Sequence, residues 1–164
     1  MQLLDQLAAS RSERDAEQAA AATQAAAAAA APAAPAASVA ASVIAKISNS
    51  AGPVTAAAQN AANAVVSNVP GADGITIGGT RASAADPGGH PSGLALDYMV
   101  GTANVPLGEA IVQYHIANWE ALGVEYVIYR QRMLSSPGGA WKSMEDRGGV
   151  TQNHMDHPHV NYRG

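Results

Sequence analysis

The sequence predicts an α+β domain with a small, mainly antiparallel sheet and a flanking helix, preceded by an alanine-rich helix and a linker. Residues 1–70 contain 28 alanines, whereas all seven aromatic residues lie between Tyr98 and Tyr162. Short strand-like runs in the second half of the chain are separated by one helical pattern and by long loops. Because large apolar side chains supply most of the free energy of burial, we expect the core within residues 71–164.

The first 70 residues divide into two expected segments. Residues 1–31 are rich in good helix formers, which predicts an alanine-rich helix or the end of a coiled coil that can pair with another helix. Pro32 and Pro35 end this helix. Residues 32–70 are rich in alanine and serine, which predicts a linker with a helical piece over 56–66.

The elements of the domain follow from periodicity and turn residues. Apolar residues at helical spacing predict a helix over 107–122, with Gly123 as its C-cap. Turns are expected at 86–89 and 135–139. Alternating patterns predict strands at 74–79, at 94–100, at 124–129 with a continuation through 134, and at 157–162.

Composition argues against several classes of protein. The chain has no cysteine, which excludes disulfides, thiolate metal sites and cysteine nucleophiles. The net charge is −4 without a block of Lys or Arg, so nucleic acid is not an expected partner. The chain has no run of about 20 strongly apolar residues, so no membrane span is predicted. The first residues also lack the pattern of a secretory signal.

Most histidines lie in two short segments, which start at His90 and at His154. Asp97 follows the first of them inside an apolar strand, where a carboxylate is costly to bury unless it is paired or metal-bound. His157 and His159 are two residues apart and point the same way on a strand. Imidazole and carboxylate groups from two such segments can form a metal site with an open position.

The pattern His90-x-x-Gly93-x-Ala95-x-Asp97 resembles the HxxGxAxD signature of the zinc D-Ala-D-Ala peptidases. Their superfamily includes the Hedgehog signalling domain, lysostaphin-type enzymes and the murein endopeptidases. The closing His154-x-x-His157-x-His159 resembles the second histidine cluster of the murein endopeptidases. The stretch from about 75 to 164 also looks like an actinobacterial or actinophage cell-wall hydrolase domain.

The resemblance implies a role for six residues. It makes His90, Asp97 and His159 the ligands of Zn²⁺, Asp156 or His157 the general base, and Arg81 a substrate-binding residue. His154 is interpreted as a substrate-binding residue or as an ordinary surface histidine. The choice of base stays open. Proline after His157 favours an extended chain that turns His157 toward the site. The acidic-x-x-His pair of the DD-carboxypeptidases favours Asp156 instead.

The implied function is zinc-dependent hydrolysis of peptidoglycan stem peptides or cross-links, outside the cell or in the cell wall. The alternative is a non-catalytic zinc-containing module that binds the cell wall or a protein, as in the Hedgehog domain. A metal-dependent nuclease is disfavoured by the acidic net charge. His115, Tyr126 and Asp86 are interpreted as a structural helix residue, a core or cleft-wall residue and a turn residue.

Overall fold

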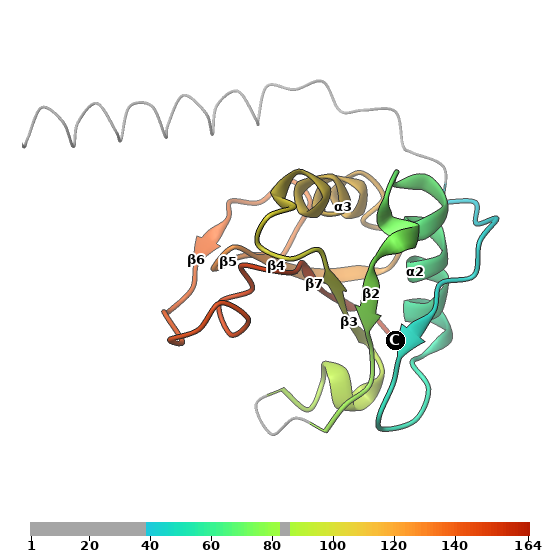
Figure 1. The fold of residues 1–164 in the computed structure, drawn as a ribbon, viewed down its shortest axis with the longest axis horizontal. Helices are drawn as coiled ribbons and strands as arrows, with labels where there is room; N and C mark the ends of the chain where they lie inside the picture. The colour runs from blue at the N-terminus through green and yellow to red at the C-terminus, as the bar shows by residue number, and fades with distance from the viewer. Residues whose placement is uncertain (1–38, 83–85) are drawn as a thin grey trace, which may run out of the picture. The chain divides into compact units, whose positions relative to one another are not determined.

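The structure is a computed structural model that describes residues 39–82 and 86–164. The helix expected over residues 1–31 lies outside the described residues. The described part has the predicted α+β class (Figure 1). Its elements are β1 (Ile47–Ser48), α2 (Ala56–Asn68), η1 (Ala72–Gly74), β2 (Thr76–Gly78), η2 (His90–Ser92), β3 (Ala95–Met99), α3 (Val105–Ala117), β4 (Val124–Tyr129), β5 (Arg132–Leu134), β6 (Lys142–Ser143) and β7 (His159–Tyr162).

The strands form one sheet in the order β1-β2-β3-β7-β4-β5-β6. Neighbouring strands are antiparallel, as predicted, except that β1 runs parallel to β2. The last strand, β7, therefore lies in the middle, between β3 and β4 (Figure 1). Asp97 on β3 pairs directly with His159 on β7, so their side chains share one face of the sheet.

Alternation along the strands separates a core face from a site face. Leu96 and Val160 belong to the core, together with side chains of α2 and α3. Asp97, His159 and Tyr126 alternate with these core positions on β3, β7 and β4. The helices thus cover one face of the sheet and leave the polar side chains on the other.

The predicted linker is the clearest correction. Residues 56–68 are helical, as expected, but this helix belongs to the core: Ala58, Ala62 and Val65 are fully buried. Alanine buries little area by itself, yet its small side chain lets the helix approach β3 of the sheet closely. The folded domain therefore begins before Gly71, and the described residues 39–70 are part of it.

The strand expected over 124–134 is two strands. β4 and β5 are joined by a two-residue turn, in which Arg130 has φ 52° and Gln131 has φ 60°. Two successive positive φ values are typical of a type I′ hairpin, where Asn or Gly usually stands. Because Arg and Gln are not typical residues of such a turn, the sequence pattern did not predict it. β6 lies outside the strands that the alternating patterns predict.

A buried polar chain links the sheet to α3. His115 Nδ1 lies 2.8 Å from the Ile111 carbonyl oxygen, to which it donates, and Nε2 lies 2.9 Å from the Tyr162 hydroxyl. The Tyr162 hydroxyl also lies 2.8 Å from that of Tyr98. A neutral His115 satisfies every member, because Tyr98 donates to Tyr162 and Tyr162 donates to Nε2. Burial lowers the pKa of His115 to about 4.

Acidification is expected to destabilise the domain through His115. Its pKa lies below the ordinary 6.5 only in the folded state, so the unfolded chain takes up the proton first as the pH falls. Stability from this group is complete above pH 6.5 and decreases toward pH 4, by about 3 kcal/mol. Urea unfolding at pH 7 and pH 4 measures the loss. His115→Gln should lose less stability over this range than wild type, and an equal loss in both would contradict the assignment.

Candidate metal centre

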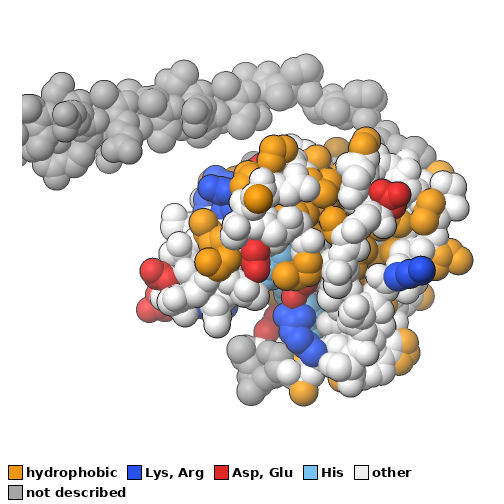
Figure 2. All heavy atoms as spheres, viewed as in Figure 1, with side chains coloured by type: hydrophobic (Ala, Val, Ile, Leu, Met, Phe, Trp, Pro, Cys, Tyr) orange, Lys and Arg blue, Asp and Glu red, His pale blue; other side chains and the backbone are white. Residues whose placement is uncertain are grey.

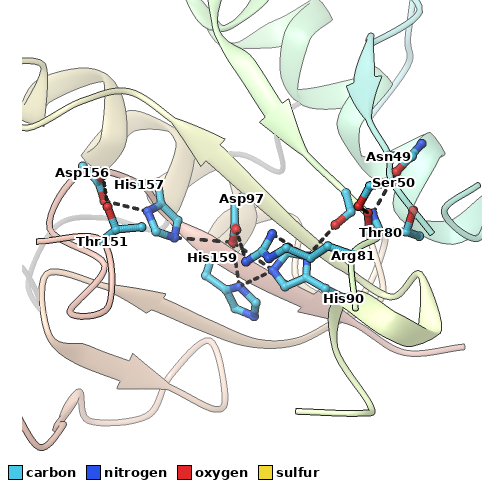
Figure 3. A network of polar contacts seen from close by, with 11 residues as sticks. Asn49, Ser50, Thr80, Arg81, His90, Asp97, Thr151, Asp156, His157 and His159 are labelled. Carbon is cyan, nitrogen blue, oxygen red and sulfur yellow. Dashed lines mark hydrogen bonds and ion pairs between the residues drawn. The ribbon is translucent and has the colours of Figure 1, made fainter. Parts of the chain in front are cut away.

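Three buried side chains converge on the site face where β3 and β7 meet (Figure 3). His90 Nε2 lies 3.2 Å from Asp97 Oδ1 and 3.2 Å from His159 Nδ1, and the latter two atoms are 2.8 Å apart. An ion held tetrahedrally at about 2.1 Å from each atom would keep them about 3.4 Å apart. His90, Asp97 and His159 could therefore hold a metal ion.

His90 and Asp97 also have a polar partner on the side that points away from the other candidate ligands. His90 Nδ1 lies 2.7 Å from the carbonyl oxygen of Gly79, which can only accept, so Nδ1 donates and Nε2 is the nitrogen free to bind a cation. Arg81 Nη2 pairs with Asp97 Oδ2 at 2.7 Å, so Oδ1 is the oxygen that faces the histidines. Outer contacts of this kind orient metal ligands.

The charges of the group suit a cation. Burial by itself raises the pKa of Asp97, but the side chains of His159 and His90 beside it hold it well below its usual range. Burial lowers the pKa of His159, although Asp97 partly offsets this effect. At neutral pH the carboxylate is ionised and His159 is neutral, which are the forms that bind metals.

Asp156 and His157 extend the group of His90, Asp97 and His159 into a larger cluster. Asp156 Oδ1 lies 2.7 Å from His157 Nδ1, and His157 Nε2 lies 3.5 Å from Asp97 Oδ1. Thr151 donates to the other oxygen of Asp156 at 2.8 Å. Figure 3 shows His157 between Asp156 and Asp97. The imidazole is thus held from behind by a carboxylate and faces the three candidate ligands.

His154 lies beside these histidines. Its ring centroid is 4.9 Å from that of His157 and 5.4 Å from that of His159. Its Nδ1 is buried without a hydrogen-bond partner among the described residues. Burial, followed by the neighbouring His159 and His157, lowers the pKa of His154 to about 3, so the ring is neutral.

The backbone at His154 is unusual, with φ 53°. The β4–β5 turn supports it, because the amides of Arg130 and Gln131 donate to the carbonyls of His154 and Asn153 at 2.8 and 2.9 Å. The three non-glycine residues with positive φ in the described chain therefore lie in two segments bonded to each other. Such a conformation persists only where its surroundings hold it, and here it positions a histidine of the cluster.

The cluster is visible from outside the molecule. In the space-filling view, histidine atoms show between acidic, basic and hydrophobic side-chain atoms on one face (Figure 2). The side chain of Arg81 is 46% exposed, whereas that of Asp97, with which it pairs, is 5% exposed. Arg81 therefore stands between solvent and the buried group.

Comparison with known families gives one match. The model of the VldE C-terminal domain matches residues 50–155. The chain belongs to this VldE family. The match begins inside the segment expected to be a linker, in agreement with the buried α2, and ends before Asp156. No curated protein and no solved structure matches the chain.

The structure brings all seven predicted site residues of this VldE-family domain into contact or close proximity. Asp97 contacts Arg81, His90, His157 and His159. Asp156 and His154 lie one step farther out, each against His157. In the described residues of the domain, no helix is long and apolar enough to cross a membrane.

Tyr126, expected to be a core or cleft-wall residue, and Asp86, expected to be a turn residue, both border the cluster. The Tyr126 ring stacks on His159, with centroids 5.8 Å apart and planes at 20°. Its hydroxyl donates to Asp86 Oδ2 at 2.8 Å. Burial and Asp86 raise the pKa of Tyr126, so the phenol keeps its proton. The pair joins the loop before His90 to the strand beside His159, and only strand pairing across the sheet brings these residues together.

Proposed function

We propose that this domain is a zinc-dependent peptidase that hydrolyses peptidoglycan stem peptides or cross-links. The observation that carries the proposal is the arrangement around Asp97. Its Oδ1 faces His90 and His159, which complete a group that could hold a metal, and also faces the carboxylate-held His157. The HxxGxAxD pattern, similar to that of the zinc D-Ala-D-Ala peptidases, supports the same conclusion.

Zinc is the proposed ion because the donor set is two imidazoles and one carboxylate. Three protein ligands are typical of catalytic zinc sites, which keep one position open. Bound there, zinc would supply a Lewis acid that acidifies water and polarises a carbonyl group. The chain's own residues would provide the remaining functions.

His157 is the proposed general base. Asp156 accepts the hydrogen bond of Nδ1, which leaves Nε2 to take a proton from the attacking water on the side of Asp97. The same nitrogen would return the proton to the amine that leaves. Asp156 lies behind His157, so its proposed role is to orient the imidazole and to stabilise the charge that develops on it.

Arg81 and His154 are the proposed substrate contacts. The guanidinium carries five N–H donors, and only some are needed for Asp97. Its exposed remainder suits a peptide carboxylate, which arginine can bind through two hydrogen bonds. His154 Nδ1 has no partner among the described residues and suits a polar group of the bound peptide. A peptidoglycan substrate would place the protein outside the cell or in the cell wall.

Digestion of purified peptidoglycan tests the function. The full chain, loaded with zinc, is incubated with peptidoglycan, and the released fragments are identified by mass. We expect peptide fragments whose release stops when a chelator removes the metal and resumes when zinc is restored. Stoichiometric zinc binding without any fragments would contradict a peptidase and favour the non-catalytic binding module.

A further inference from the structure

The segment before α2, residues 47–55, is connected to the candidate metal centre through one backbone carbonyl, that of Gly79. The Gly79 oxygen accepts the hydrogen bond of His90 Nδ1 and thereby selects Nε2 as the nitrogen available to a cation. Gly79 directly follows β2, and it is not a member of the metal-binding group. The position of its carbonyl therefore depends on whatever holds the chain after β2.

Residues 48–50 hold that chain on both sides of the peptide. The Gly79 amide donates to the Ser48 carbonyl at 2.9 Å. The Thr80 amide donates to Asn49 Oδ1 at 2.8 Å, and the Thr80 carbonyl accepts from the Ser50 amide at 2.8 Å. Figure 3 shows Asn49, Ser50 and Thr80 close together on the far side of His90 from the cluster. The Gly79–Thr80 peptide is thus held by its own N–H group and by the peptide groups on either side of it.

Packing removes the remaining freedom. A Cβ added at Gly79 would lie 2.1 Å from Asn49 Oδ1, 2.5 Å from Ile47 Cγ2 and 2.9 Å from Val54 Cγ1. No side chain fits at such distances, so glycine is required for this close approach. Thr80 is 2% exposed, and its hydroxyl donates to the Gly52 carbonyl.

The same segment also supports the turn that carries His90. Thr55 donates its amide to the Gly93 carbonyl at 3.0 Å, and Gly93 ends the short helix η2 with φ 76°. A Cβ at Gly93 would lie 3.2 Å from the backbone of Pro53, Val54 and Thr55. His90 is therefore held from two directions, through its acceptor Gly79 and through its own turn.

We propose that residues 47–55 are a brace for the metal centre, in which Asn49 is a positioning residue that fixes the Gly79 carbonyl and thereby the orientation of His90. The brace makes no contact with the ion itself. The proposal rests on the zinc site of the proposed function, but it does not depend on peptide hydrolysis. A group bonded directly to a metal ligand, as the Gly79 carbonyl is to His90, typically contributes 10–100-fold to affinity, and Asn49 acts through that carbonyl.

Zinc affinity of Asn49 variants tests the brace. Competition with a chelator of known affinity gives the Kd of the full chain. Asn49→Ala removes the acceptor of the Thr80 amide, so we expect the Kd to rise by about 10-fold. Asn49→Asp keeps an acceptor oxygen and should retain most of the affinity. Unchanged affinity in Asn49→Ala would overturn the proposal.

Asn63→Ala is the matched control. Asn63 Oδ1 accepts the Ala45 amide at 2.8 Å, the same bond at the same length, but on α2 and away from His90. This variant should lower the melting temperature and leave the zinc Kd unchanged. An equal loss of affinity in Asn63→Ala would show that Asn49 acts only through general stability, which would overturn its role as a positioning residue.

NMR of the wild-type imidazole nitrogens gives a measurement that needs neither a variant nor hydrolysis. We expect the Nδ1 proton of His90 in the metal-free and the zinc-loaded chain, with coupling to the Gly79 carbonyl. A His90 without a proton on Nδ1 would overturn the brace. Absence of zinc binding by wild type would instead contradict the proposed function, so the two failures are distinguishable.

Discussion

His159→Ala is expected to abolish stoichiometric zinc binding. The substitution removes one of the three donor atoms and leaves Asp97 Oδ1 without its shortest contact, at 2.8 Å. Structural zinc sites bind with about 10–16 kcal/mol in total, so the loss of one ligand should weaken binding on the order of 10²–10³-fold. Metal analysis after gel filtration, together with chelator competition, measures the change.

His154→Ala is the control for this experiment. It removes a histidine whose ring lies 5.4 Å from that of His159 but which is not one of the three candidate ligands. Zinc content should stay near one ion per chain. Undiminished zinc in His159→Ala, or an equal loss in His154→Ala, would show that the ligands are assigned wrongly.

His157→Ala is expected to slow hydrolysis by about 10²–10⁴-fold while zinc stays bound, because a general base contributes this much to rate. Asp156→Asn should have a smaller effect, since an amide oxygen can still accept from Nδ1 although it carries no charge. Hydrolysis rates and zinc contents of both variants, measured in parallel, separate the two roles.

Thr151→Val provides the control for Asp156. It removes the hydroxyl that donates to Asp156 Oδ2 and leaves the bond between Asp156 and His157 in place. Its rate should stay within about 10-fold of wild type. Full activity in His157→Ala with zinc bound would rule out His157 as the base. A larger loss in Asp156→Asn than in His157→Ala would transfer that role to Asp156.

The sequence predicted the elements whose pattern is local. Alternation predicts the strand that carries Asp97, and helical spacing predicts the helix that carries His115; both are present. The burial of α2 was not predictable in this way. Its alanines look like a linker in isolation, and only the sheet that packs against them makes them part of a core.

The candidate site shows the same division. The resemblance to the HxxGxAxD signature and to a second histidine cluster implied the group of His90, Asp97 and His159. The structure brings these residues together by pairing His159 with Asp97. The role of the Gly79 carbonyl could not be predicted from the sequence, because every residue of any chain has a backbone acceptor. The contact between Tyr126 and His159 could be predicted only from the position of Tyr126 on β4, next to β7.

The central place of β7 has a consequence for the order of folding. Strands β1 to β3 and strands β4 to β6 are joined in the sheet only through β7, the last strand of the described chain. During synthesis the two halves must wait for residues 159–162 before they can close into one sheet, and such distant pairings form slowly. His159 arrives with that strand. Closure of the sheet and completion of the metal-binding group are therefore a single event, and a nascent chain that stops short of β7 has neither.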